Sequence, residues 1–570
     1  MILSLRAALR GAVAGDVAPN SNPEPVNTIQ FLVRAARRWR LVGSLLAAGL
    51  GAAAWGAPLI IDVREAGAVG DGQALCTAAI QQCIDRCAAA GGGTVLLAGG
   101  TYVSGTLEMK SRVTLQIEAG ATLLGSPRPQ DYPARRSAVR SYTDNYVRQA
   151  LLVGENLEHV TLRGAGTIDG NGGAFRWKEY LTRPYVIRFV QCRDVLVEGL
   201  TLQASPMWMQ HYLACDRLRL RGLRVFNHVS YNNDGLDLDG CHDVAVSDCV
   251  FDTDDDALCL KSTLDRACEN VTISNCVLSS HCNAFKLGTE SNGGFQNITL
   301  ANCVILSPRF SKVMYGIQRG LGGIALEMVD GGRLENVAIS NVTIDGVNVP
   351  IFLRLGHRAR PFAADGPKPA MGSFRNVSIS NVIATRTGSI GCSITGLPGH
   401  AVENVALVNV SVESAGGGKR ELVDKAIPEL PGAYPESRMF GDLPAYGFYC
   451  RHVRGLTIDG LRLHARAPDA RHALVCDDVQ GLDLHGLKTG SAPGSAPVVR
   501  LTQCQDMLVR GCYPGGVAEV FLQVDGDASR GIALVGNDLS RVGRVAQIAG
   551  GLPPEVVREA GNLGPPTVPR

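Results

Sequence analysis

The sequence predicts an all-β chain built as a right-handed parallel β-helix, a solenoid in which short strands stack coil upon coil. From about residue 158 a motif of alternating apolar residues recurs, and its matching positions step from Val244 to Val271 to Ile298, 27 residues each time. A unit of two or three such strands cannot bury its own apolar side, so it must stack on its neighbours. Glycine is abundant at 67 residues and aromatic residues are sparse at 5%, which is typical of many turns and few long helices.

The first 57 residues are expected to be a leader with a secretory signal. Four arginines between residues 34 and 40 precede an uncharged apolar run at 41–55, with small residues at Ala52 and Ala54. The run is short for a membrane span, and no later segment is long and apolar enough to span. We therefore expect export to the periplasm or the extracellular space.

Residues 58–545 are expected to form the solenoid. Thr77–Ala90 has apolar residues at helical spacing and ends at Gly91, which predicts a helix that caps the N-terminal end of the array. The segments 357–373 and 412–447 interrupt the repeat and are predicted loops, which could wall a groove or cover an end. Residues 546–570 are rich in proline and are expected to form a tail.

Two columns of identical residues follow from stacking the repeats. Five asparagines share one slot after the first strand, where asparagine tolerates positive φ in a turn; they are Asn275, Asn302, Asn341, Asn381 and Asn409. Cys249, Cys276 and Cys303 form a second column. Stacked residues have parallel Cβ vectors, so we expect these thiols to pack inside without disulfides.

Charge and cysteine spacing exclude several function classes. The net charge of +2 gives no strong field for nucleic acid or an anionic membrane. The 17 cysteines include no CxxC pair, so no zinc site is indicated.

Acidic residues gather at 231–262, where two short strands each follow an acidic turn. Aligning the interior leucines Leu236 and Leu258 stacks Asp234 on Asp256, with Asn283 next in that column, and places Asp255 beside them. We expect all three aspartates within several ångströms on one outer face. Asp239 and Lys261 are expected to meet as a cross-strand pair.

Three stacked acids call for a functional explanation. Like charges repel and raise one another's pKa, a cost usually tolerated at functional sites. Paired acids on neighbouring coils are what a glycosidase needs, since it must protonate a leaving oxygen and activate water. A calcium site is the rival explanation, and we favour catalysis.

The chain resembles glycoside hydrolase family 28, the polygalacturonases and their relatives. The resemblance runs through residues 61–72, 89–126, 205–215, 232–240, 253–262, 434–448 and 469–479. The family's Asn-x-Asp-Gly motif matches Asn232, Asp234 and Gly235. Its Asp-Asp pair, followed by a strand that ends in lysine, matches Asp255, Asp256 and Lys261.

The resemblance implies an inverting glycoside hydrolase acting on a pectin-related plant cell-wall polysaccharide or oligosaccharide. Asp255 would be the general acid, and Asp234 with Asp256 the base pair that activates water. No metal or organic cofactor is implied, and we expect a monomer.

Two departures from the family pattern concern substrate binding. The family's Gly-His-Gly falls on Cys282-Asn283-Ala284, with His281 just before it. Its Arg-Ile-Lys, which grips a galacturonate carboxylate, falls on Ala325-Leu326-Glu327, and an acid there is unfavourable for an anionic sugar. The candidate substrate-binding residues are Trp208, His211, Lys261, His281, Asn283, Lys286 and Glu327. Trp208 is expected either to stack on a sugar or to pack under a loop.

Two alternatives remain open at this stage. One is a polysaccharide lyase on the same fold, which needs calcium and a basic residue near a uronate carboxylate. The other is a non-catalytic carbohydrate-binding β-helix, which has no need of three stacked acids.

Overall fold

The computed structural model describes residues 59–565, apart from 140, 142–146, 176–178, 180–181 and 363–364. The chain divides into two compact units, 1–57 and 58–570, and only the second is described here. The predicted leader therefore lies outside the described residues. Among the residues described, no helix has the length and apolar character needed to cross a bilayer.

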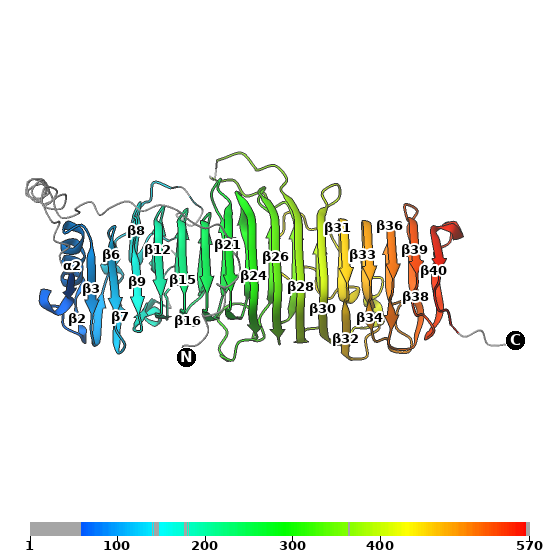
Figure 1. Cartoon of the computed structure of the whole chain (residues 1–570), viewed down its shortest axis with the longest axis horizontal. Coiled ribbons are helices and arrows are strands. Elements are labelled where there is room, and N and C mark those ends of the chain that lie inside the picture. The colour runs from blue at the N-terminus through cyan, green and yellow to red at the C-terminus, as the bar shows by residue number, and fades with distance from the viewer. Residues whose placement is uncertain are drawn as a thin grey trace, which may run out of the picture. The chain divides into compact units, whose positions relative to one another are not determined.

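The unit 58–570 is a parallel β-helix, as predicted. The described residues of this unit form 41 strands in one connected sheet that wraps around the solenoid in three layers, and Figure 1 shows them following one another in sequence order. Strands pair in parallel with the next coil, and parallel crossover connections of this kind are right-handed.

One layer carries the predicted acids and is called the site layer. It consists of β5 (Leu107–Glu108), β8 (Ala150–Glu155), β11 (Tyr185–Val190), β14 (Gln210–Leu213), β17 (Leu236–Asp239), β20 (Leu258–Ser262), β23 (Asn283–Ser291), β25 (Gly322–Met328), β27 (Val349–Leu355), β29 (Cys392–Thr395), β31 (Ala445–Asp459), β33 (His472–His485), β35 (Val499–Thr502), β38 (Ala518–Asp525) and β40 (Val542–Ile548).

The other two layers complete each coil, and several long strands, β31 and β33 among them, run through two layers. The second layer consists of β1 (Ile60–Asp62), β3 (Gly93–Leu97), β6 (Val113–Ile117), β9 (Thr161–Gly164), β12 (Arg193–Glu198), β15 (Asp216–Arg221), β18 (His242–Ser247), β21 (Cys268–Ser274), β24 (Gly294–Leu306), β26 (Arg333–Asp345), β28 (Ser373–Thr387), β30 (Val402–Gly416), β36 (Gln505–Arg510), β39 (Arg530–Val535) and β41 (Val557–Ala560). The third layer consists of β2 (Asp71–Leu75), β4 (Gly100–Ser104), β7 (Ala121–Gly125), β10 (Thr167–Asp169), β13 (Thr201–Gln203), β16 (Arg224–Asn227), β19 (Val250–Thr253), β22 (Val277–Ser280), β32 (Arg462–Ala467), β34 (Lys488–Thr489) and β37 (Tyr513–Pro514).

The predicted register is confirmed. Val244 pairs with Val271, which pairs with Ile298. In the site layer Leu236 lies opposite Leu258, and both are fully buried. Each such side chain contributes roughly 1.5–3 kcal/mol when buried, so a slip by one residue, which would turn the whole apolar set outward, is strongly disfavoured.

Both ends of the solenoid can be compared with the prediction. The α-helix α2 (Thr77–Ala89) forms where expected and buries Ile80, Cys83, Ile84 and Cys87; its role as a cap stays a prediction. Short 3-10 helices are η1 (Val63–Ala66), η2 (Pro129–Asp131), η4 (Gly172–Phe175), η6 (Arg420–Leu422) and η7 (Pro554–Val556).

The predicted C-terminal boundary of the solenoid, at residue 545, is wrong. β40 runs across it, and β41 pairs with β39, because apolar residues such as Val556 continue the core after a short turn.

The asparagine column has the predicted conformation. Asn341 has a φ of 55°, donates to the side chain of Asn302 over 3.1 Å, and accepts from Asn381 over 3.1 Å. A second column, which we did not predict, runs from Asn270 through Asn297, Asn336 and Asn376 to Asn404. These ladders satisfy polar groups at the turns of consecutive coils.

Candidate active site

The three predicted aspartates meet at one place on the site layer. Asp234 stands in the turn before β17, and Asp255 and Asp256 stand in the turn before β20. The amide of Gly235 donates to the carbonyl of Asp256 over 2.9 Å, so the two turns lie on adjacent coils at the same position. One carboxylate oxygen from each aspartate lies within 4.8 Å of the others. Their residues are only 2%, 7% and 3% exposed.

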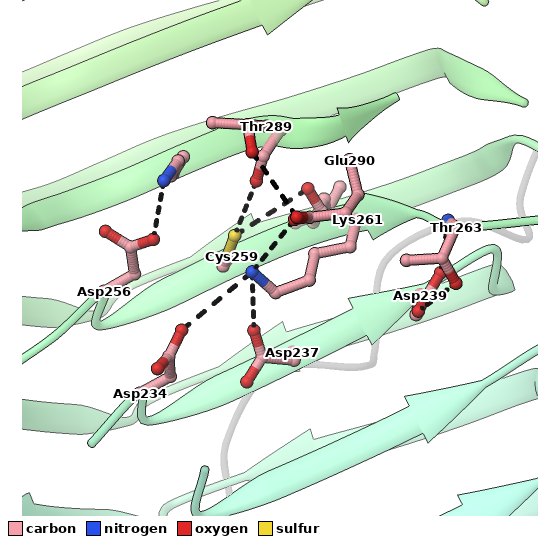
Figure 2. Close-up of polar contacts among 12 residues, drawn as sticks. Asp234, Asp237, Asp239, Asp256, Cys259, Lys261, Thr263, Thr289 and Glu290 are labelled. Carbon is pink, nitrogen blue, oxygen red and sulfur yellow. Dashed lines mark hydrogen bonds and ion pairs between the residues drawn. The ribbon is translucent and has the colours of Figure 1, made fainter. Parts of the chain in front are cut away.

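Lys261 lies among the acids instead of pairing with Asp239. Its Nζ is 3.4 Å from Asp237, 3.5 Å from Glu290 and 4.0 Å from Asp234, as Figure 2 shows. The backbones of Asp239 and Lys261 are register partners, as predicted, but the predicted side-chain pair is wrong.

The reason is that the Asp239 carboxylate already has other donors. It accepts from the amide of Thr263 over 2.8 Å and from the Thr263 hydroxyl over 2.7 Å. Nε2 of His211 lies 3.2 Å from Oδ2, the oxygen that accepts from the Thr263 hydroxyl. The long side chain of Lys261 is therefore left to turn toward Asp237 and Asp234.

Asp256 is surrounded by hydrogen-bond donors. Nζ of Lys286 lies 2.9 Å from one carboxylate oxygen. The other oxygen accepts from the amide of Asn283 over 3.2 Å and from its side-chain Nδ2 over 2.9 Å. Charge-assisted hydrogen bonds of this kind favour a carboxylate, so the predicted stacking of Asn283 on Asp256 is confirmed as a contact.

Asp255 and Asp234 have environments that favour the protonated form. Burial, with the neighbouring Asp256 carboxylate, raises the pKa of Asp255 to about 7, although Lys286 and Lys261 oppose the rise. Burial, followed by the charges of Asp255 and Asp237, holds the pKa of Asp234 well above its usual range. Two carboxyl groups with raised pKa values, beside a third that is held by hydrogen-bond donors, suit acid–base chemistry.

The cluster is a poor place for a divalent cation. Three carboxylates at this spacing resemble a set of calcium ligands. However, the ammonium group of Lys286 contacts Asp256, and that of Lys261 approaches Asp234. These two positive charges stand where the cation's charge would be needed.

His281 does not turn to the three acids. Its Nδ1 lies 3.0 Å from Asp254, and its Nε2 lies 3.0 Å from the carbonyl of Phe310. Asp254 also accepts from the amides of Met314 and Tyr315. Asp254 and His281 therefore anchor the loop between β24 and β25, and substrate binding by His281 stays a prediction that these contacts do not support.

Trp208 and His211 are covered by other side chains. His211 is fully buried, and Trp208 is 8% exposed. Trp208 packs against Tyr185 with ring centroids 5.5 Å apart, and Nζ of Lys261 lies 4.7 Å from its ring centroid. Of the two expectations for Trp208, packing fits these contacts, with a cation–π interaction that helps to hold Lys261.

Glu327 is also enclosed. Its carboxylate lies 3.9 Å from Lys286, and among the described residues neither oxygen has a hydrogen-bond donor. Burial raises the pKa of Glu327 to about 8, against the opposing charge of Lys286. Glu327 is therefore neutral below that pH, so the acid in this position brings less negative charge than its residue type suggests.

Sequence reasoning missed the charged groups that the loops contribute. Arg360 is one of them, and it pairs with Glu290 of β23, which also lies 3.5 Å from Lys261. Arg358 and Arg360 come from the predicted loop 357–373, and both contact Asp330. Loops carry no periodicity, so no signal in the sequence placed these side chains near the acids.

Comparison with known proteins agrees with this geometry. The sequence model of "Glycosyl hydrolases family 28" matches residues 88–428. A probable polygalacturonase of Vitis vinifera is 30% identical over 250 residues, which cover 40% of this chain and 49% of that protein. An exo-poly-alpha-D-galacturonosidase of Dickeya chrysanthemi is 37% identical over 130 residues, which cover 21% of this chain and 20% of that protein. The chain thus spans about half or less of the length of these curated relatives.

A solved structure supports the fold. The exopolygalacturonase of Thermotoga maritima superposes with a TM-score of 0.53 at 21% identity, covering 62% of this chain and 87% of that chain. At this identity the likeness concerns the β-helix alone. The match to the family covers more than half of the chain, and the chain therefore belongs to glycosyl hydrolase family 28.

Proposed function

We propose that the chain is a glycoside hydrolase that cleaves O-glycosidic bonds of a pectin-related polysaccharide or oligosaccharide. The observation that carries the proposal is a trio of buried carboxyl groups with oxygens within 4.8 Å and unlike surroundings. Membership of family 28 and the polygalacturonase names of the relatives support the substrate class.

In the proposed reaction Asp255 donates its proton to the glycosidic oxygen as the bond from that oxygen to the anomeric carbon breaks. Asp234 and Asp256 hold a water, which attacks the anomeric carbon and gives up a proton to the member of this pair that is not already protonated. Two hydrogen bonds of about 2.7 Å at a tetrahedral angle span about 4.4 Å, so one water fits between oxygens at the observed spacing. The products are a sugar with a free anomeric hydroxyl and the leaving group with its hydroxyl restored.

The proposal that the reaction inverts the anomeric configuration rests on the resemblance of the two aspartate motifs to those of family 28. Inverting enzymes usually separate acid and base by about 6.5–9.5 Å, and retaining enzymes by about 5–5.5 Å. The three aspartates here have carboxylate oxygens within 4.8 Å of one another, and this spacing does not by itself favour inversion. NMR of the first anomer released decides the point, because inversion yields the opposite anomer to that of the substrate.

The central experiment is Asp255→Asn, assayed for release of reducing ends from pectic substrates. We expect turnover to fall by about 10²–10⁴-fold, the usual contribution of a general acid, with unchanged circular dichroism. Asp265→Asn, at an exposed position on the following turn, is the matched control and should retain full activity. Retained turnover in Asp255→Asn would falsify the role assignment.

The same assay separates the alternatives. A lyase would form an unsaturated product that absorbs in the ultraviolet and would lose activity with a chelator, whereas the hydrolase should do neither. A binding protein would retain oligosaccharides without releasing reducing ends. We also propose that the protein is exported, on the strength of the arginine-rich and apolar segment at 34–55.

A further inference from the structure

The outward face of the site layer is covered on both sides of the acids. Its outward residues follow one column of register partners: Arg188, His211, Asp237, Cys259, Lys286, Ala325 and Phe352. Each of them is buried. Outward residues of an exposed sheet face water, so other parts of the chain lie over both ends of this column, at Arg188 and His211 on one side and at Ala325 and Phe352 on the other.

On the N-terminal side, the described residues Ser141 and Val147, which precede β8, form one wall. Val147 is fully buried against Tyr185, Met207 and Trp208, and its carbonyl accepts a hydrogen bond from Arg188 over 3.0 Å. The hydroxyl of Ser141 is hydrogen-bonded to that of Thr263 over 2.8 Å. These contacts place Val147 against β11 and the turn before β14, and they tie Ser141 to Thr263, which follows β20.

On the C-terminal side, the insertion between β30 and β31 forms a second wall. Its residues Ile427, Phe440 and Leu443 pack on Ala325 and Phe352 of the site layer. The hydroxyl of Ser437 donates to the carbonyl of Leu321 over 3.1 Å, in a buried hydrogen bond. This wall covers the layer from β25 onward, and it is held by apolar contacts of the kind found in a core.

Between the walls lie β17, β20 and β23, which carry the acids and the two lysines. Parallel strands are spaced by about 4.8 Å, so this floor is about 10–15 Å long. Two half-exposed rings stand beside it. Tyr315 is 50% exposed, and its amide is bound by Asp254. Tyr434 is 55% exposed, with its ring centroid 5.8 Å from Nζ of Lys286.

We propose that this site receives the end of a saccharide chain and removes a terminal unit at each turnover, rather than cutting within the chain. The inference rests on the proposed hydrolase function. Cutting within a polysaccharide needs a groove that continues past the acids in both directions, and here both directions are covered by buried contacts. Tyr315 and Tyr434 line the entrance, where tyrosine rings suit the apolar faces of sugars.

The experiment follows product size from the first minutes of digestion of pectic polysaccharides and of oligosaccharides of defined length. We expect the terminal unit to be the only small product from the start, with solution viscosity lagging far behind the release of reducing ends. Fragments of intermediate length at early times would overturn the inference, while reducing-end release would still support the hydrolase. No release from any pectic substrate would overturn both.

End-blocked oligosaccharides give an independent measure. One set is reduced to an alditol at the reducing end, and the other carries a modified terminal sugar at the non-reducing end. A site that takes chain ends should lose at least tenfold in kcat/KM with one of the two blocks and little with the other. Equal cleavage of both sets, away from the blocked units, would contradict the inference.

Discussion

Asp255 shows how one carboxyl group acquires the property that its role requires. Its buried surroundings and the neighbouring Asp256 raise its pKa to about 7, so it keeps a proton over the mildly acidic range. A general acid works only while protonated, so we expect kcat/KM to fall as pH rises through about 7. A pH–rate profile checks this, and an alkaline limb that begins only above pH 9 would contradict it.

The same pKa makes a prediction about stability. Asp255 titrates near 3.8 as an ordinary aspartate and near 7 in the folded chain. Below about pH 4 both states are protonated and the group contributes nothing. As pH rises toward 7 the unfolded state releases a proton that the folded state keeps, so folding stability falls, by at most about 4 kcal/mol.

Asp255→Asn lacks this pH dependence. We expect its melting temperature to exceed that of the wild type at pH 7 and the difference to shrink toward pH 4. Thermal unfolding across that range, with Asp265→Asn as control, provides the measurement. A difference in melting temperature between variant and wild type that does not change with pH would count against a raised pKa of Asp255.

At the scale of elements, the strands were predictable from the sequence and the loops were not. Leucines at alternate positions of β17 and β20 determine which face points inward, so Asp234 and Asp256 could be stacked in advance. Period-2 alternation says nothing about where a long side chain turns, which is why Lys261 was assigned to Asp239 in error. Tyr434, Arg360 and Ser437 come from insertions without any repeat, so only the folded chain shows what they contact.

The asparagine column makes a prediction about a turn. Asn341 combines a φ of 55° with side-chain hydrogen bonds to both neighbouring coils. Asn341→Ala should lose about 2 kcal/mol, since alanine costs about 1–2 kcal/mol in this backbone region and makes neither bond. Asn341→Gly should lose less, because glycine adopts positive φ freely.

Chemical denaturation of both variants measures the difference. Thr343→Ala, at an exposed position two residues further along β26, is the control and should stay within about 0.5 kcal/mol of the wild type. Equal losses in the alanine and glycine variants would show that the backbone conformation contributes nothing at this turn.

Over the whole molecule, the solenoid and its insertions have different roles. Stacked coils provide a rigid floor on which Asp234, Asp255 and Asp256 are held by backbone pairing. The segments that leave the solenoid supply the walls, the entrance tyrosines and Arg358 and Arg360. Changes in loops can thus alter which sugar enters without disturbing the acids.

The cysteines supply a last prediction at this scale. All 17 are buried and unbridged in the part of the chain that the structure describes. Two of them, Cys83 and Cys87, lie in α2, and most of the others lie in strands or in the turns between strands, where Cβ vectors stacked on successive coils do not converge on disulfide geometry. Burial raises the pKa of thiols such as Cys259 well above the usual value, and the thiolate is the reactive form. The folded protein should therefore react slowly with Ellman's reagent, even though export would expose it to oxidising conditions.

Denatured without reductant, the protein should titrate all 17 thiols, and reductant should leave the melting temperature of the folded protein unchanged. A shortfall of two or more thiols, restored by reductant, would mean that a pair has bridged and that at least one coil departs from parallel stacking. Full titration would instead show that packing of successive coils, with hydrogen-bonded ladders at their turns, stabilises this solenoid without any covalent cross-link.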